Sequence, residues 1–378
     1  MAKIELCNIT KKFGSITALD NISFEVNDKE FFVLFGPAGA GKTTILKVIA
    51  GIEFPDKGEV RISDKNVNHT EPAKRNISMV FENYALYPHL TIYDNIASPM
   101  RSPLYKKDED TVKKEVLRVA SMMKIDHLLD RLPSQVSNGQ RQRTALGRCL
   151  VREPNVFLMD EPIAHLDAKL RHFMRAELKE MQSEFDTTTI YVTHDYMEAL
   201  SLGDRIAIID QGKILQIGTG DEVYLTPASE FVAKFIGEPE INIFHIDLVK
   251  KENQMFAQML GQEVNCKIEE DVAKVLEAGS YQNVNIGLRG NDLTFSFRKE
   301  NEEYMNGKIY SVEPIGNKTI LVIDVNGQLL RLIAPNDLKA NIDDEIFVRA
   351  KMEKAMFFNA DDHEYIYRHN QNELLGVK

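Results

Sequence analysis

The sequence predicts an α/β domain built on a parallel sheet, followed by a smaller all-β domain. With 378 residues the chain exceeds the size at which one hydrophobic core usually stops growing, so two domains are expected. The apolar runs at residues 31–35 and 156–159 are typical of strands buried on both faces of a parallel sheet. After residue 241 the pattern changes to short strands separated by turns. We therefore predict one domain over residues 1–236 and a second over 241–378.

The elements of the first domain are predicted from the spacing of apolar residues. Residues 1–27 alternate apolar and polar positions around a turn near Phe13-Gly14, which indicates an antiparallel β subdomain. A third buried strand is predicted at 189–192, and a strand at 213–217 follows the turn Gln211-Gly212. Between the first two buried strands, residues 91–150 form a helical subdomain that opens with the capping pair Thr91 and Asp94.

The second domain is predicted from five strand-like runs, at residues 284–288, 293–297, 320–325, 329–333 and 346–351. Asn326-Gly327 separates two of these runs. Both residues tolerate positive φ, so this dipeptide predicts a tight hairpin.

Composition excludes several classes of protein. No apolar stretch approaches the roughly 20 residues that a membrane-spanning helix needs, and the first residues lack the pattern of a secretion signal, so a cytoplasmic location is expected. The formal net charge of -11 argues against sequence-independent nucleic-acid binding. The cysteines Cys7, Cys149 and Cys266 are far apart and are interpreted as reduced packing residues.

The strongest motif is a phosphate-binding loop between a buried strand and a helix. Glycines at such a loop let backbone N–H groups surround phosphate oxygens, and the helix N-terminus adds partial positive charge. Lys42 is predicted to reach the β and γ phosphates of ATP, and the Thr43 hydroxyl to bind Mg²⁺. The predicted ATP-binding residues of this loop are Gly36, Pro37, Ala38, Gly39, Ala40, Gly41, Lys42, Thr43 and Thr44.

Two carboxylates, Asp160 and Glu161, follow the second buried strand, at the sheet edge where ligands of α/β proteins collect. Taken alone, an acidic pair here is more often a turn or a helix cap. Beside a phosphate loop, Asp160 is predicted to support Mg²⁺ and Glu161 to be the general base for the attacking water.

Residues 136–143, Val-Ser-Asn-Gly-Gln-Arg-Gln-Arg, resemble the signature of ABC transporter ATP-binding subunits, which is usually Leu-Ser-Gly-Gly-Gln. Alone, this string is equally compatible with a capped helix, because Ser137 is a good N-cap. The resemblance implies that the signature contacts ATP held by a second ATPase subunit. The residues expected to make this contact in trans are Ser137, Asn138, Gly139, Gln140 and, from the loop that links the two sites, Asp167.

The same resemblance, over about residues 3–236, assigns further roles. Phe13 resembles the aromatic residue that stacks on adenine, although a buried strand aromatic is the alternative. Glu82 stands at the position of the family's glutamine and is expected near ATP and Mg²⁺. His194 resembles the switch histidine that contacts the γ-phosphate and acts in catalysis. The surface that receives the coupling helix of a permease is expected at Tyr84, Tyr87, Pro88 and His89.

Short motifs at residues 237–242 and 286–289 resemble the OB-like regulatory domain of maltose-type carbohydrate importers. This implies an ATPase subunit at the cytoplasmic face of the cell membrane, dimeric, with two transmembrane permease subunits and, indirectly, an extracytoplasmic solute-binding protein. The expected cargo is a carbohydrate or polyol.

Two departures keep alternatives open. Glu82 replaces an amide that can both bind Mg²⁺ and donate a hydrogen bond, and Asn138 replaces a glycine. A weakly hydrolytic half of a heterodimeric ATPase pair is therefore one alternative. A soluble ABC ATPase that acts on ribosomes or DNA is another, disfavoured by the single cassette.

Overall fold

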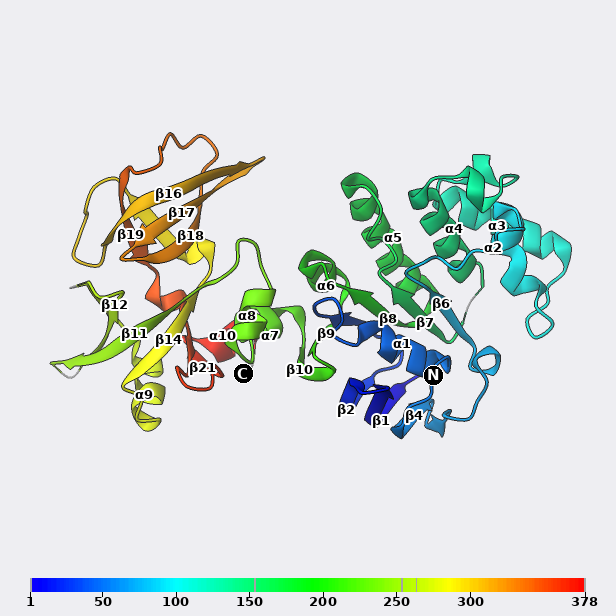
Figure 1. Cartoon of the computed structure of the whole chain (residues 1–378), viewed down its shortest axis with the longest axis horizontal. Coiled ribbons are helices and arrows are strands. Elements are labelled where there is room, and N and C mark those ends of the chain that lie inside the picture. Colours follow the sequence, from blue (N-terminus) through cyan, green and yellow to red (C-terminus); the bar gives the residue numbers. More distant parts are fainter. Residues whose placement is uncertain (1, 153, 253, 263, 377–378) are drawn as a thin grey trace. The chain divides into compact units, whose positions relative to one another are not determined.

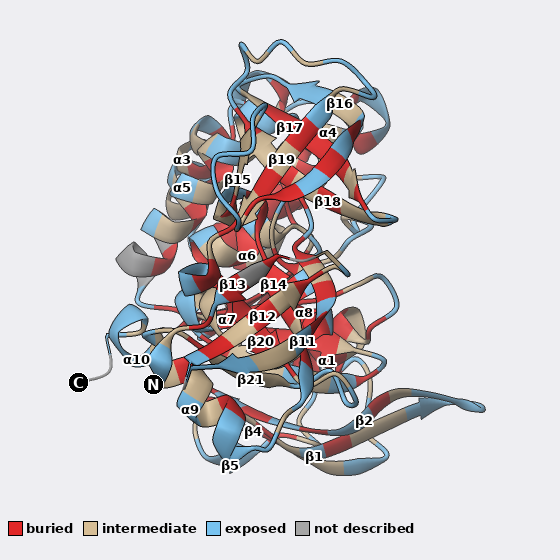
Figure 2. Cartoon of the chain, turned by 90° about the vertical axis from the view of Figure 1, so that its left-hand side faces the viewer, coloured by how far each residue is buried: buried red, intermediate tan, exposed pale blue. Residues whose placement is uncertain are grey.

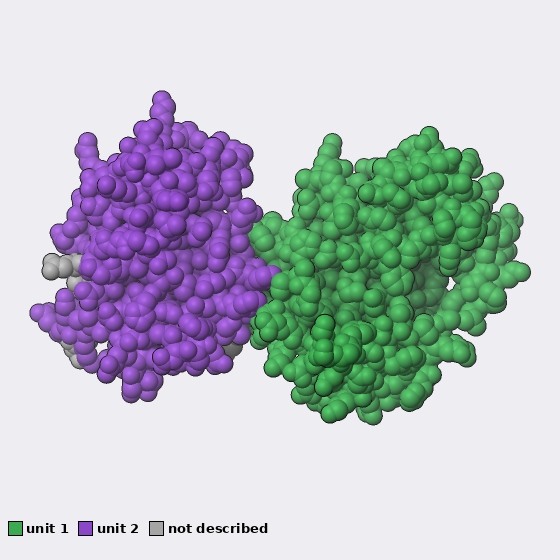
Figure 3. Space-filling view, viewed as in Figure 1, with its two compact units in different colours: residues 1–220 green, residues 221–378 purple. Residues whose placement is uncertain are grey.

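The computed structural model describes residues 2–376 except 153, 253 and 263. Contacts divide the chain into two compact units, Met1–Gly220 and Asp221–Lys378 (Figures 1 and 3). No helix among the described residues is both long and apolar enough to span a membrane.

A six-stranded sheet forms the centre of the first unit (Figure 1). Its strand order is β10-β9-β3-β8-β7-β6, and the strands are parallel except β10, which pairs antiparallel with β9. Every residue of β3, β7 and β8 is buried, as the apolar runs predicted. The strand bounds are β3 (Phe31–Phe35), β6 (Ile77–Val80), β7 (Val156–Asp160), β8 (Thr188–Thr193), β9 (Arg205–Asp210) and β10 (Lys213–Gly218).

A second, antiparallel sheet in this unit has the order β2-β1-β4-β5. It contains β1 (Ile4–Phe13), β2 (Ile16–Val26), β4 (Lys57–Ile62) and β5 (Lys65–Asn66). The predicted turn lies between β1 and β2, where Gly14 has a φ of 61°. Apolar residues of this sheet share one core with α1 (Lys42–Ala50) and with β3, β7, β8 and β9.

The predicted helical insert is confirmed as α2 (Ile92–Arg101), α3 (Glu109–Met122) and α4 (Asn138–Leu150). Thr91 caps α2, its hydroxyl accepting a hydrogen bond from the Asp94 N–H at 3.0 Å. The remaining helices are α5 (Ala168–Phe185) and α6 (Tyr196–Leu202).

The second unit is built on two antiparallel sheets, of order β13-β12-β11-β14-β20-β21 and β15-β19-β16-β17-β18. Buried residues of both sheets form one core. Figure 2 colours buried residues red on strands of both sheets. The predicted hairpin is confirmed between β17 and β18, where Asn326 and Gly327 have φ of 52° and 84°. The strands are β11 (Asn242–Lys251), β12 (Gln254–Met259), β13 (Asn265–Lys267), β14 (Asn283–Leu288), β15 (Leu293–Ser296), β16 (Met305–Ile315), β17 (Lys318–Val325), β18 (Gln328–Ala334), β19 (Glu345–Ala350), β20 (Met356–Phe358) and β21 (Tyr365–Arg368).

Among the described residues, four α-helices also belong wholly or mainly to this unit: α7 (Gly220–Leu225), α8 (Glu230–Phe235), α9 (Glu270–Ala278) and α10 (Gln371–Leu374). The all-β expectation therefore missed α9, which buries Val272 and Leu276 in the core of the sheets. The spacing of Val272, Val275 and Leu276, at i, i+3 and i+4, is that of a helix face, and this signal in the sequence could have identified α9.

The boundary between the two units lies between Gly220 and Asp221, earlier in the chain than the boundary predicted from the sequence at 236–241. The domain boundary at 236–241 stays a prediction. Helices α7 and α8 are bonded to the strands of the second unit. The Arg289 guanidinium donates to the Tyr224 carbonyl at 2.9 Å and also to the Ile236 carbonyl. The Asn285 amide donates to the buried Glu230 carboxylate at 2.7 Å. These bonds explain why the two helices cluster with the second unit.

Candidate active site

The phosphate loop joins β3 to α1, and glycine is required at several of its positions. A Cβ on Gly36 would lie 2.1 Å from the Ile209 carbonyl oxygen, so no side chain fits there. Gly39 and Gly41 have φ of 80° and 105°, in the region that favours glycine. The loop can therefore place backbone N–H groups at the start of α1.

Lys42 is the first residue of α1 and is 6% exposed. Its ammonium donates to the carbonyl oxygens of Gly36 and Pro37, both at 2.8 Å. Burial lowers the pKa of this amine, and the nearby carboxylates of Glu161, Asp160 and Glu82 oppose that shift. The loop thus holds a buried cation beside three carboxylates.

Thr43 and Asp160 meet beneath the loop. The Thr43 hydroxyl donates to Asp160 Oδ1 at 3.2 Å. Burial raises the pKa of Asp160 from 3.8 to about 6; the carboxylates of Glu82 and Glu161 add to the rise, while Thr43 and Lys42 oppose it. Shifted pKa values of this kind cluster at functional sites.

Glu161 and His194 follow the neighbouring strands β7 and β8, so parallel pairing brings them together. The Glu161 N–H donates to the Val192 carbonyl at 3.1 Å, and Glu161 has a φ of 46°, which is uncommon for a non-glycine residue. His194 Nδ1 lies 2.9 Å from Glu161 Oε1. The geometry thus joins the residue predicted to be the general base to the predicted switch histidine.

A cavity of about 500 Å³ opens over the loop. Thr43, Thr44, Glu82 and Glu161 line it, and Asp160 and His194 are bonded to its lining residues. Phe13 is 45% exposed and does not line this cavity. Ile16, which pairs with Phe13 across β1 and β2, does line the cavity.

Sequence reasoning missed part of this lining. Gln211 and Gly212, interpreted only as a turn, reach the cavity because they follow β9, the neighbour of β3. The Gly212 N–H donates to the Ala40 carbonyl at 3.0 Å, which ties this turn to the phosphate loop. The rule that ligands collect at the carboxyl ends of parallel strands would have identified the turn.

The segment that resembles the ABC signature opens α4 and does not line the cavity. Ser137 and Gln140 form a reciprocal capping box, with bonds of 3.3 and 2.8 Å. Asn138 turns its side-chain oxygen onto the Arg141 guanidinium. A Cβ on Gly139 would lie 3.7 Å from a Leu166 methyl, so the signature and the loop before Asp167 are adjacent.

The expected coupling segment is held to α4 by Arg148. Its guanidinium donates to the carbonyls of Tyr84 at 2.9 Å and Ala85 at 2.7 Å, and both of these residues have positive φ. Tyr87, Pro88 and His89 are exposed. The structure therefore leaves residues 87–89 exposed to solvent and anchors the preceding backbone at Tyr84 and Ala85 to α4.

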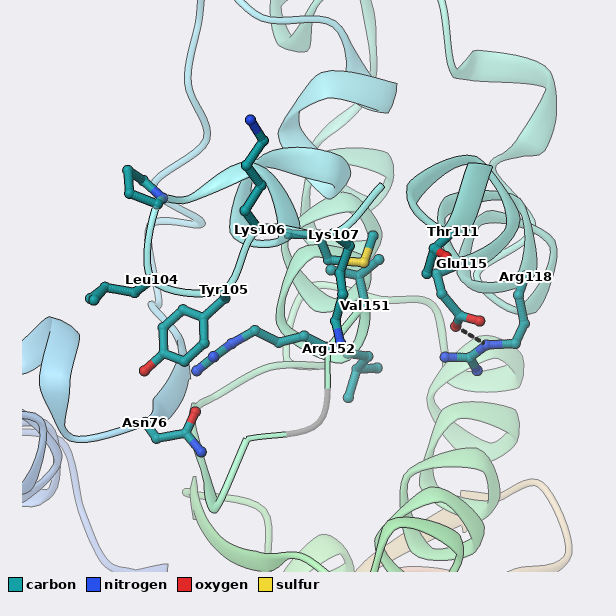
Figure 4. A pocket seen from close by; sticks show the side chains of 13 residues that line it. Asn76, Leu104, Tyr105, Lys106, Lys107, Thr111, Glu115, Arg118, Val151 and Arg152 are labelled. Carbon is teal, nitrogen blue, oxygen red and sulfur yellow. Dashed lines mark hydrogen bonds and ion pairs between the residues drawn. The ribbon is translucent and has the colours of Figure 1, made fainter. Parts of the chain in front are cut away.

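A second cavity, of about 620 Å³, lies among α2, α3 and the end of α4 (Figure 4). Arg152 lies over the Tyr105 ring at 3.9 Å, and Arg118 pairs with Glu115 at 2.7 Å. None of its lining residues was assigned to nucleotide binding. Without the phosphate loop or its carboxylates, it is not the hydrolytic site.

A phosphate loop on a parallel sheet, with a buried lysine and a carboxylate–histidine pair, defines a nucleoside triphosphatase of the P-loop class. The family model for ABC transporters matches residues 19–164. The trehalose/maltose import ATP-binding protein of Thermococcus litoralis is 44% identical over 86% of this chain and 89% of its own length. The chain therefore belongs to the ATP-binding proteins of the ABC transporter family and is an ATPase.

Other relatives agree with this assignment. The maltose/maltodextrin import ATP-binding protein of Vibrio vulnificus is 36% identical over 96% of each chain. The sn-glycerol-3-phosphate import ATP-binding protein of Cupriavidus necator is 49% identical over 65% of this chain and 67% of its own. A solved dimeric ATP-binding cassette in a post-hydrolysis state, with ADP and Pi, is similar at a TM-score of 0.54 with 30% identity, over 57% of this chain and 98% of that one.

Proposed function

We propose that this chain hydrolyses ATP to drive import of a carbohydrate or polyol-type solute through separate permease subunits. The observation that carries the proposal is the arrangement of Lys42, Thr43 and Asp160 beside the Glu161–His194 pair, at one edge of the sheet. The relatives named above for trehalose, maltose, maltodextrin and sn-glycerol-3-phosphate import support the class of solute.

The proposed chemistry follows from the position of each group. ATP phosphates compete with the carbonyls of Gly36 and Pro37 for the Lys42 ammonium, which gives a charge-assisted contact. Glu161 accepts the proton of the attacking water. His194, bonded to Glu161, orients that carboxylate and reaches toward the γ-phosphate. Gly36, Gly39 and Gly41 shape the loop, and Thr44 lies in the first turn of α1.

The residues present fit Mg²⁺. A hydroxyl and a carboxylate, Thr43 and Asp160, lie 3.2 Å apart, and Glu82 lines the same cavity. The described residues contain no group of three or more His, Cys, Asp or Glu side chains that could hold a metal ion. Mg²⁺ does not need such a group, because it binds one or two carboxylates together with substrate phosphates. Bound there, Mg²⁺ would neutralise charge that develops on the phosphates.

We further propose the assembly that the resemblance implies. Two ATPase subunits bind ATP between them, with Ser137, Asn138, Gly139, Gln140 and Asp167 facing the partner's nucleotide. The exposed segment Tyr84 to His89 receives a permease at the cytoplasmic face of the membrane. The adjacency of Gly139 and Leu166 supports this arrangement, because it presents the signature and the Asp167 loop on one surface.

The test combines one variant with one purification. Glu161→Gln should keep ATP binding while hydrolysis falls by roughly 10² to 10⁴, because the general base is lost and the shape is kept. ATP with Mg²⁺ should then trap a dimer on size-exclusion chromatography. The chain isolated from its native membrane should carry two permease chains. Wild-type turnover in the variant removes Glu161 from the reaction, and ribosomes or DNA in place of permeases refute transport.

A second candidate, a weakly hydrolytic half of a heterodimeric pair, is favoured by Glu82. This carboxylate lines the cavity with Glu161, where an amide would add no charge. A like-charge contact with the γ-phosphate costs about 4 kcal/mol at 4 Å near a surface, offset by attraction to Mg²⁺. Asn138 is accommodated by its bond to Arg141, so we expect its effect to be the smaller one.

A further inference from the structure

The His194 side chain is fixed by little of its own packing. Its imidazole is 58% exposed, and its Nδ1 lies 2.9 Å from Glu161 Oε1. The orientation of the ring therefore depends on the backbone at residue 194. That backbone lies between Thr193, the last residue of β8, and Asp195, the N-cap of α6.

The buried carboxylate of Glu198 is linked by hydrogen bonds to the residues on both sides of His194. Tyr191 and Thr193 are two residues apart on β8, so both hydroxyls point to the same face of the sheet. On that face lies Glu198 of α6, which is 3% exposed. Its Oε2 accepts a hydrogen bond from the Tyr191 hydroxyl at 2.9 Å and another from the Thr193 hydroxyl at 2.8 Å. Because the Thr193 hydroxyl donates to Glu198, its lone pairs remain available to accept.

The Thr193 oxygen uses that capacity across His194. It accepts a hydrogen bond from the Asp195 N–H at 3.0 Å, closing a short turn around the histidine. Asp195 is anchored in turn, because its carboxylate accepts from the N–H groups of Met197 at 2.8 Å and Glu198 at 3.3 Å. The chain on either side of His194 is thus tied to one buried group.

We infer that Glu198 is a positioning residue for catalysis, which acts through Thr193 to hold His194 against Glu161. The inference rests on the proposed role of His194. Burial raises the pKa of Glu198, so the carboxylate is costly to keep at this position, and Tyr191, Thr193, Asp195 and Arg175 are the groups that face it. An apolar side chain would fill the same space without the free-energy cost of burying a charge.

Two single substitutions separate positioning from packing. Thr193→Val and Tyr191→Phe each remove one hydroxyl from the same Glu198 oxygen, but only Thr193→Val also releases the Asp195 N–H. We expect Thr193→Val to lower kcat by between about 10- and 100-fold with KM for ATP unchanged within twofold. Tyr191→Phe should keep kcat within about twofold. Thr193→Ser, which keeps a hydroxyl at this position, should have the kcat of the wild type.

Glu198 is tested in the same assay on the full-length chain. Glu198→Gln keeps an oxygen acceptor and should stay within about threefold of wild-type kcat, whereas Glu198→Met should behave like Thr193→Val. If Glu198→Met does not fold, the Thr193 variants still decide. Equal losses in Tyr191→Phe and Thr193→Val would overturn the inference, because they would indicate general packing.

A double-mutant cycle and a spectrum distinguish this inference from the proposed role of His194. In a His194→Ala background, Thr193→Val should cause no further loss of kcat. An undiminished cost there overturns the positioning role. Wild-type kcat in His194→Ala refutes the proposed role of the histidine instead. In that case the NMR resonances of the His194 imidazole still test whether Glu198 and Thr193 position the ring. The resonances should shift in Thr193→Val and not in Tyr191→Phe. Unchanged resonances in both variants overturn the inference.

Discussion

Replacing Asp160 with asparagine should stabilise the protein when nucleotide and Mg²⁺ are absent. Burial raises the pKa of Asp160 from 3.8 to about 6. Between pH 4 and 6 the native state therefore holds more protons than the unfolded state, and the free energy of unfolding falls as pH rises through this window. At 1.36 kcal/mol per pKa unit, the rise of about 2.2 units corresponds to about 3 kcal/mol at pH 7.

Asparagine carries no charge and keeps an oxygen to accept the Thr43 hydroxyl. The variant should gain up to about 3 kcal/mol at pH 7 and nothing below about pH 4, since wild-type Asp160 is then neutral. For a unit of this size, 3 kcal/mol is a rise in Tm of roughly 6 to 12 °C. With ATP and Mg²⁺ the order should reverse, because the asparagine binds the cation weakly.

The chain contains no tryptophan, so calorimetry or circular dichroism is the suitable assay. The transition of the first unit is identified as the one that ATP shifts upward in the wild type. Asp130→Asn, which changes an exposed aspartate in the same unit, is the matched control and should move Tm by less than about 1 °C. A Tm for Asp160→Asn below wild type at pH 7, or a gain that does not depend on pH, would refute the reasoning.

The remaining predictions concern nucleotide binding, the domain boundary and the partnership of subunits. Lys42→Ala should weaken ATP binding itself, measured by titration calorimetry, because a charge-assisted contact to phosphate is deleted; unchanged affinity contradicts its role. Limited proteolysis should first cut between the units near residues 219–222 and not at 236–245, where Ile236 and Ile241 are buried; a first cut at 236–245 restores the boundary predicted from sequence. If this chain normally works beside a paralogous ATPase, the double variant Glu82→Gln with Asn138→Gly should raise the ATPase rate of the homodimer. The pairing is contradicted if the double variant hydrolyses ATP no faster than the wild type and this chain is the sole ATPase in the native complex.

Local sequence signals determined the elements that carry the chemistry. The apolar runs of β3, β7 and β8 predicted strands buried on both faces, and all three strands are fully buried. The glycines of the phosphate loop and the Asn326-Gly327 hairpin were equally clear, because positive φ restricts the residues that a turn accepts. These signals lie within a few residues of one another, so they can be recognised without the fold.

The tertiary structure decided which distant residues meet. The pairing of β7 with β8 places His194 against Glu161, and the position of α6 over β8 brings Glu198 to Thr193; no local pattern in the sequence marks Glu198. The bonds of Arg289 likewise draw α7 and α8 into the second unit, and no local pattern predicts them. Such contacts depend on how strands pair and helices cross. The free energy of burying a carboxylate or a guanidinium is therefore fixed by partners from elsewhere in the chain, which sequence periodicity does not reveal.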